Sequence, residues 1–134
     1  KNITVMYRET SGGTVTPHTL KFHRKLEGNL QNVFNELAKD PTFYVKEIGT
    51  YSYRRVVGNP NRLSNHSYGI AIDVNPQCNP YIKNGKVLGG HNVYDKDLSI
   101  RSSSDKVVRA FAKYGFGWGG SYKDYMHFSY FDGR

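Results

Sequence analysis

Hydrophobic positions recur at two different spacings in the first half of the chain, and each spacing predicts a different element. Apolar and polar residues alternate over 3–7, which predicts a short strand. From 26 to 37 apolar residues recur every three or four positions, which predicts one amphipathic helix running to about Lys39. We place its start at Thr16-Pro17, because Thr caps helices and Pro is tolerated at the first helical position. Asp40-Pro41 is expected to end it.

The second half of the chain alternates between strand and helix patterns. β-branched and aromatic residues predict a strand over 43–53, and residues 68–74, apolar on both faces, predict a central buried strand. Ser104-Asp105 precedes an apolar stripe and is expected to cap a helix over 106–114. The alternating residues 126–130 predict the last strand.

Asn84-Gly85 lies between two short apolar segments, a strong signal for a tight hairpin. We expect this hairpin to form a flap near a cleft, because it follows the buried strand 68–74. No repeat or linker divides the sequence, so residues 1–134 are predicted to form a single domain. The predicted fold is α+β, with two helices packed on one face of a mostly antiparallel sheet and a cleft on the other face.

The composition narrows the range of partners. Nineteen Lys and Arg against eleven Asp and Glu give a net charge of +8, which favours a polyanionic partner. The basic residues are scattered and carry no nucleic-acid-binding signature, so nucleic acid is not an expected partner. A solvated basic surface that only keeps the protein soluble is the alternative. No apolar run approaches the roughly 20 residues of a membrane span, and the single cysteine, Cys78, excludes an internal disulfide.

One stretch, residues 64–73, begins as a polar loop and continues as an apolar strand, which puts His66 at the mouth of the strand and Asp73 inside it. Burying an unpaired carboxylate is costly, so Asp73 needs a metal or a cationic partner. Far downstream, His127 adds a second imidazole. Two histidines and one carboxylate form a zinc set that leaves a fourth position for water. We therefore predict a zinc site of His66, Asp73 and His127, with Asp124 close to the metal but not bound to it.

These two segments fill the fixed positions of a pair of motifs. The residues that match SxHxxGxAxD are Ser64, His66, Gly69, Ala71 and Asp73. The second motif is Asp124-x-x-His127. The chain thus resembles the zinc D-alanyl-D-alanine carboxypeptidase family, which also contains the D-Ala-D-Ala dipeptidases of vancomycin resistance and the L-alanyl-D-glutamate endolysins of phages. The resemblance extends from about residue 20 to the C-terminus, through the segments 51–54 and 115–120, and implies the fold of the hedgehog signalling domain.

The family hydrolyses bonds in the peptide stems of bacterial peptidoglycan, so the resemblance implies a peptidoglycan substrate and a zinc cofactor. It also implies two catalytic residues: Asp124, which moves a proton from water to the leaving amine, and Arg54, which faces the substrate. An anionic cell-wall polymer is then the partner that best fits the basic charge. We further expect a monomer that acts outside the cytoplasm, although no export signal is visible in the chain.

Three functions remain open on the sequence. The arginines at 54, 55 and 62 and the flap at Asn84-Gly85 favour a D-alanyl-D-alanine carboxypeptidase, in which a cation pairs with the terminal carboxylate of the substrate. An L-alanyl-D-glutamate endopeptidase is the close alternative. A non-catalytic zinc module is the third, but it would be expected to lose Asp124 or Arg54, and a structural zinc would need a fourth ligand, for which only His91 is a candidate.

Overall fold

A four-stranded antiparallel sheet, in the order β3-β6-β10-β9, forms the centre of the computed structural model, which describes residues 1–52, 55–56 and 59–130. The strands are β3 (Ile48–Gly49), β6 (Ala71–Val74), β9 (Phe116–Trp118) and β10 (His127–Tyr130). Strands β6 and β10 are neighbours although more than fifty residues separate them in sequence. The sheet therefore joins the two halves of the chain.

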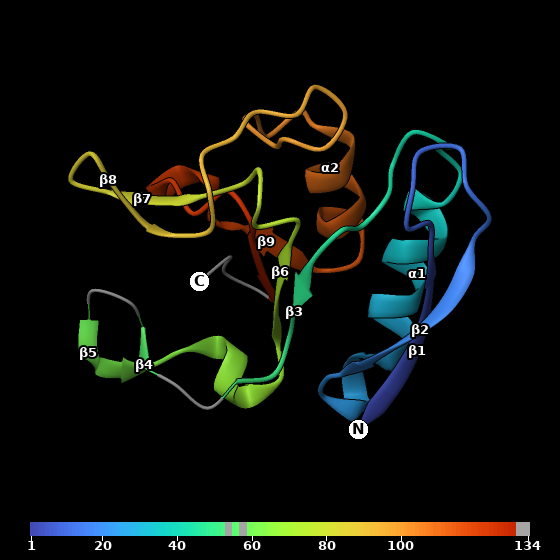
Figure 1. Cartoon of the computed structure of the whole chain (residues 1–134). Coiled ribbons are helices and arrows are strands. Elements are labelled where there is room, and N and C mark those ends of the chain that lie inside the picture. The colour runs from blue at the N-terminus through green and yellow to red at the C-terminus, as the bar shows by residue number, and fades with distance from the viewer. Residues whose placement is uncertain (53–54, 57–58, 131–134) are drawn as a thin grey trace.

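Three two-stranded antiparallel sheets and two helices surround this centre. The sheets pair β1 (Asn2–Tyr7) with β2 (Thr16–Lys21), β4 (Arg55–Val56) with β5 (Asn59–Leu63), and β7 (Tyr81–Lys83) with β8 (Lys86–Gly89). The helices are α1 (Glu27–Leu37) and α2 (Lys106–Lys113), and short 3₁₀ segments are η1 (Arg24–Leu26), η2 (Asn65–Tyr68) and η3 (Gly119–Tyr122). In Figure 1, α1 and β1–β2 lie on one side of the central sheet, and the hairpins β4–β5 and β7–β8 extend on the other.

Both helices contribute to one hydrophobic core with one face of the sheet. Phe111 of α2 stacks on Phe128 of β10 with ring centroids 4.1 Å apart, and Phe34 of α1 meets Phe111 edge to face at 6.2 Å. Because strand residues alternate between faces, Asp73 and His127 project from the face opposite Ile72 and Phe128. The mixed α/β architecture with antiparallel sheets confirms the predicted class, and the hedgehog-like packing stays a prediction.

Several local signals in the sequence are confirmed. The hairpin β7–β8 turns at Asn84 and Gly85, whose φ angles of 53° and 75° are those of a type I′ turn. Helix α2 is capped by Asp105, whose carboxylate accepts a hydrogen bond of 2.8 Å from the Val107 N–H. Gly115 follows this helix with a φ of 94°, in the left-handed region that favours glycine.

The predicted helix start at Thr16-Pro17 is wrong. Residues Thr16–Lys21 form β2, which pairs along its whole length with β1, and helix α1 begins only at Glu27. The capping signal at Thr16 is local, whereas the pairing with β1 depends on a segment nine or more residues away. Pro17 is compatible with this two-stranded sheet, since an edge strand has positions that need no donor.

Three other boundaries also differ from prediction. Within the predicted strand 43–53, only Ile48–Gly49 is a strand among the described residues. The predicted strand 68–74 begins at Ala71, because residues Asn65–Tyr68 form η2. The predicted loop 56–65 contains β5, which pairs with β4. Composition therefore indicated the approximate place of each element but not its ends.

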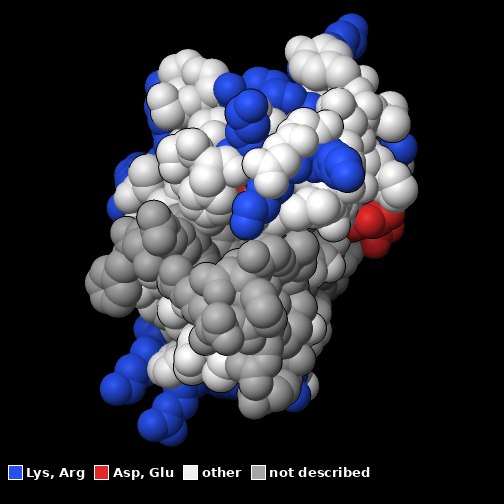
Figure 2. Space-filling view, turned by 90° about the vertical axis from the view of Figure 1, so that its left-hand side faces the viewer, with Lys and Arg blue, Asp and Glu red and all other residues white. Residues whose placement is uncertain are grey.

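The surface carries the excess of basic residues. Figure 2 shows Lys and Arg side chains over much of the face that looks out from the left of Figure 1, with far fewer Asp and Glu. This distribution agrees with the net charge of +8. None of the described helices is long and apolar enough to cross a membrane.

Candidate metal centre

His66 is presented by η2, a single short turn that the surrounding sequence shapes closely. The Ser64 hydroxyl caps this turn by accepting a hydrogen bond of 3.2 Å from the His66 N–H. Gly69 ends it with a φ of 69°, and a side chain there would stand 3.1 Å from the backbone nitrogen of His23. Two fixed positions of the SxHxxGxAxD motif therefore serve to orient the imidazole between them.

Asp73 and His127 are brought together by strand register. They are directly opposite partners in the antiparallel pair β6–β10, on the face away from the core. Directly opposite residues on one face have Cβ atoms about 5 Å apart, so the pairing alone places both side chains within reach of one small atom. Ala71 and Ser129, the next opposed pair on the same face, are both fully buried.

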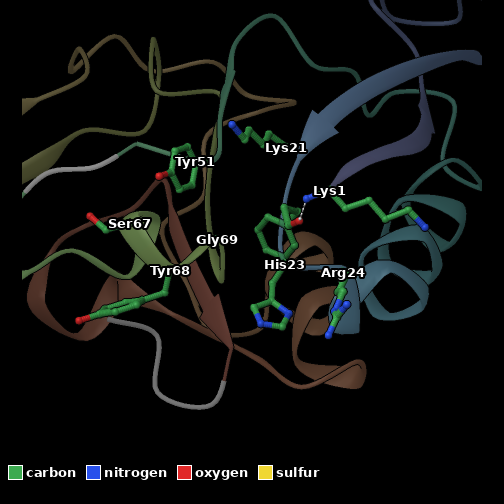
Figure 3. Close-up of a pocket in the computed structure, with 9 residues that line it drawn as sticks. Lys1, Lys21, His23, Arg24, Tyr51, Ser67, Tyr68 and Gly69 are labelled. Atoms are coloured by element: carbon green, nitrogen blue, oxygen red, sulfur yellow. Dashed lines mark hydrogen bonds between the residues drawn. The ribbon is translucent and has the colours of Figure 1, made fainter.

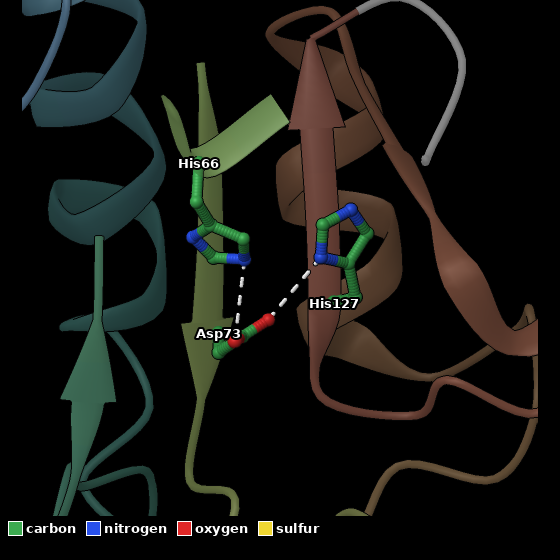
Figure 4. Close-up of side chains that lie close together, drawn as sticks. All are labelled: His66, Asp73 and His127. Atoms are coloured by element: carbon green, nitrogen blue, oxygen red, sulfur yellow. Dashed lines mark hydrogen bonds and ion pairs between the residues drawn. The ribbon is translucent and has the colours of Figure 1, made fainter. Parts of the chain in front are cut away.

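The three predicted ligands converge, as Figure 4 shows. Nε2 of His66 lies 3.2 Å from Oδ2 of Asp73, and Nδ1 of His127 lies 3.2 Å from Oδ1. All three ligand atoms lie within 4.8 Å of one another, and both histidines are buried. The predicted set of His66, Asp73 and His127 is thus brought to one point in the structure.

The hydrogen bond at the other nitrogen of His66 determines its tautomer. Nδ1 stands 2.6 Å from the carbonyl oxygen of Thr50, which can only accept, so Nδ1 carries the hydrogen. In the neutral ring, Nε2 then presents a lone pair. That buried atom has no hydrogen-bond partner among the described residues, although the carboxylate of Asp73 lies close by. A lone pair facing a carboxylate is stabilised by a cation between the two atoms, either a metal ion or a proton bound to Nε2.

The residues fit a zinc ion. A tetrahedral site with ligand bonds of about 2.0–2.2 Å separates its ligand atoms by roughly 3.3–3.6 Å, close to the two observed separations of 3.2 Å. Two imidazoles and one carboxylate are a donor set that zinc prefers, and the carbonyl of Thr50 is the outer partner that orients such a histidine. The group could therefore hold a metal ion with three protein ligands.

The electrostatic balance at Asp73 points the same way. Burial alone would raise the pKa of this carboxyl, but the close imidazoles of His127 and His66 outweigh burial and hold the pKa well below its usual range. The carboxylate is therefore ionised at neutral pH. An ionised, mostly buried carboxylate between two imidazoles is suited to binding a cation.

Asp124 lies outside the group of three and is half-buried in the loop between η3 and β10. Its backbone N–H donates to the Gly119 carbonyl at 2.9 Å, and its carbonyl accepts from the His127 N–H at 3.2 Å. A methyl group on Gly119 would lie 2.7 Å from the Asp124 carbonyl oxygen. The loop thus ties Asp124 to a metal-ligand candidate and tolerates only glycine at 119.

Hairpin β7–β8 is attached to the same loop. Tyr81 forms an isolated antiparallel bridge with Asp124, and the Ile82 N–H donates to the Lys123 carbonyl at 2.9 Å. Burial and the charge of Asp124 together raise the pKa of the Tyr81 phenol. The predicted hairpin is therefore confirmed, and its first strand supports the segment that carries Asp124, while its role as a flap stays a prediction.

The sequence analysis did not identify two buried asparagines that hold the loop after the Asp73 strand in place. Asn79 is fully buried and bonds through its side chain to the Leu98 carbonyl at 3.1 Å and the Ile100 N–H at 2.6 Å. Asn75, with a φ of 49°, accepts from the Lys46 N–H at 2.8 Å. These asparagines fasten the loop after β6. The Asn and Pro residues of this segment predicted a loop, but they did not show which side chains of the loop would be buried.

Three other residues singled out in the sequence do not join the candidate metal ligands among the described residues. Arg54 lies outside the described residues. His91 is exposed and is not part of the group that could hold a metal. Cys78 is a free, buried thiol whose pKa is raised by burial, which agrees with a structural role. Neither residue supplies a fourth ligand to the described set.

Among the described residues, two buried histidines and an aspartate form a group that could hold a metal ion through three protein ligands, which leaves a fourth position for water as in catalytic zinc sites. The model of the D-alanyl-D-alanine carboxypeptidase family matches residues 58–130, just over half of the chain. The chain belongs to this family, whose members are metallopeptidases and are typically zinc-dependent. No curated protein and no solved structure matched the chain.

Proposed function

We propose that this protein is a zinc-dependent peptidase that removes the terminal D-alanine from peptidoglycan stems ending in D-Ala-D-Ala. The observation that carries the proposal is the convergence of His66, Asp73 and His127, with ligand atoms within 4.8 Å, inside a chain of the carboxypeptidase family. Such a reaction takes place where peptidoglycan is exposed, so we also propose that the protein acts outside the cytoplasm, as a monomer.

Zinc bound by these three residues would polarise the scissile carbonyl and lower the pKa of water to ~7. Asp124 is the proposed general base, because it is a carboxylate three residues from His127 that does not belong to the ligand group. It takes a proton from the attacking water and delivers it to the leaving amine. Arg54 is proposed to pair with charge on the substrate.

Support for a carboxypeptidase over an endopeptidase comes from the matched family and from the hairpin. Strand β7 pairs with the segment of Asp124, so β7–β8 stands beside the proposed base and can limit the length of chain that passes it. An endopeptidase needs an open groove at that end. L-alanyl-D-glutamate cleavage is the alternative that the following test addresses.

The test compares two forms of one muropeptide, both ending in D-Ala-D-Ala, with the C-terminus free in one and amidated in the other. Mass spectrometry should show that the free form loses one D-alanine and that the amidated form reacts far more slowly. Equal cleavage of both forms contradicts the carboxypeptidase. Release of an intact stem from L-alanine identifies the endopeptidase, and no cleavage of either by zinc-loaded protein favours a non-catalytic module.

A further inference from the structure

A cavity of about 310 Å³ lies beside η2, separate from the group of His66, Asp73 and His127. Strand β2 and η1 form one side of it, and residues 51 and 67–69 form the other, as Figure 3 shows. Its polar lining residues include Lys21, His23, Arg24, Tyr51, Ser67 and Tyr68. Nothing in the proposed reaction uses these side chains.

The lining is strongly biased in charge. It contains three Lys or Arg residues, and none of the nine residues that line it is an Asp or Glu. All three are exposed, but Lys1 is paired with Glu27 at 2.9 Å, so Lys21 and Arg24 are the cations available to a ligand among the described residues. Lys21 stands over the ring of Tyr51, with Nζ 4.8 Å from the centroid, and this contact helps to hold the ammonium in place. The cavity therefore attracts anions.

A backbone hydrogen bond joins the two sides of the cavity: the His23 N–H donates to the Gly69 carbonyl at 2.8 Å. Within the second side, the Ser67 hydroxyl donates to the Ser52 carbonyl at 3.1 Å. Ser67 directly follows His66 on the same turn. A ligand in the cavity would thus contact the turn that presents a candidate metal ligand.

We propose that this cavity binds an oxyanion group of the cell wall, either a carboxylate of the peptidoglycan that is cut at the metal centre or a phosphate of a wall polymer that accompanies it. The proposal rests on the proposed function for the identity of the polymer. The volume is at the lower end of the range for ligand pockets, suited to one sugar or amino-acid unit. Tyr68, 53% exposed at its edge, offers an aromatic face to such a unit.

A nucleic-acid strand fits this site less well than a wall polymer. Proteins that bind single strands use a groove with a series of aromatic side chains for successive bases. Here the basic lining surrounds one compact cavity, and the ring of Tyr51 is already covered on one side by Lys21. The geometry favours a single anionic group over a continuous strand.

The test uses zinc-loaded protein and a double variant, Lys21→Gln with Arg24→Gln. Lys25→Gln is the matched control, because Lys25 is exposed next to Arg24 but does not line the cavity. For glycan-linked muropeptides the double variant should raise KM roughly 3- to 30-fold with kcat unchanged, the effect of losing two exposed charge pairs. For a short acyl-D-Ala-D-Ala peptide, KM should not change in any variant.

Direct binding separates this proposal from the proposed function. Calorimetry at fixed ionic strength should show that the double variant loses affinity for a muramyl peptide, a poly(glycerol phosphate), or both, which identifies the source of the oxyanion. If no peptide is hydrolysed but this loss is seen, the proposed function fails and the cavity assignment stands. The assignment is overturned if the double variant binds both probes like the parent, if Lys25→Gln has the same effect, or if oligothymidylate binds the cavity more tightly than either probe.

Discussion

Nδ1 of His66 donates a hydrogen bond to the carbonyl oxygen of Thr50 over 2.6 Å, and this single contact directs Nε2 toward Asp73. Thr50 directly follows β3, which pairs with β6 on the side opposite β10. Three neighbouring strands of the sheet therefore act on one centre: β6 and β10 supply ligand candidates, and the residue after β3 orients the third.

The first prediction concerns metal content. The parent protein should bind one zinc ion per chain, and His127→Ala should bind it at least ~100-fold more weakly, because the loss of a ligand exceeds the effect of losing an outer partner. Elemental analysis after dialysis against a zinc buffer measures both. His91→Ala is the control and should retain zinc, since His91 is exposed and outside the group. Equal zinc content in His127→Ala and the parent would reject the ligand assignment.

A second prediction separates metal binding from chemistry. Asp124→Asn should keep zinc and lose roughly 10²–10⁴-fold in kcat, because an amide cannot shuttle a proton. Zinc content and hydrolysis of a D-Ala-D-Ala muropeptide are measured on the same preparation. Release of the metal by this substitution would show that Asp124 is a ligand and not the base.

Arg54→Ala gives a third prediction of the same form. It should retain zinc and lose about 10²–10³-fold in kcat if the guanidinium stabilises developing charge as other such donors do. Arg54→Lys should recover part of the loss for a free carboxylate substrate. An unchanged kcat in Arg54→Ala would remove Arg54 from the proposed mechanism.

A fourth prediction concerns the loop that carries the base. In Gly119→Ala the added methyl group would meet the Asp124 carbonyl at 2.7 Å and its Cβ at 3.1 Å, so the loop must shift. Because misplacement of a catalytic group by about 1 Å costs on the order of 10²-fold, kcat should fall steeply while zinc is retained. Gly28→Ala in α1, where nothing lies within 4 Å, is the control and should leave kcat unchanged and stabilise the fold by about 0.5 kcal/mol.

The last prediction links pH to stability through Asp40. Hydrogen bonds from Lys106, and then from Thr42, lower its pKa from 3.8 to about 2. Since the pKa of Asp40 is lower in the folded state, its ionised carboxylate contributes to the free energy of unfolding. This contribution is fully present above about pH 3.8 and is lost as the pH falls through about 2. Both partners are about one-third exposed, so solvent screening keeps the effect below ~1 kcal/mol.

At pH 7, urea unfolding should show that Asp40→Asn is less stable than the parent by up to ~1 kcal/mol. Near pH 2 the two proteins should differ little in stability. Asp97→Asn, at an exposed loop position, is the control for removal of a negative charge. A stability difference that persists undiminished at pH 2 would show that Asp40 acts through something other than its charge.

The sequence predicted best those features that depend on nearby residues. The conformations of Asn84, Gly85 and the Asp105 cap depend on the residue types at those positions. His66 and Asp73 converge because they are seven residues apart, on a turn that leads directly into a strand. The pairing of β2 with β1 could not be predicted, because the capping signal at Thr16 and the long-range hydrogen bonds compete and only the fold decides between them. Thr50 left no signal, since it acts through its backbone carbonyl.

Strand β7 pairs with the segment of Asp124, which fixes the base of hairpin β7–β8. The tip of the hairpin is therefore a position where substitutions could alter the proposed substrate selectivity. The bridge at Tyr81 lies at the base of the hairpin, whereas Asn84 and Gly85 form its tip, and no heavy atom lies within 4 Å of a methyl group placed on Gly85. Loops of other lengths grafted between Lys83 and Lys86 would change what the hairpin covers and leave the register at its base intact. Under the proposed function, the residues that limit the substrate and the proposed base Asp124 could therefore be altered independently.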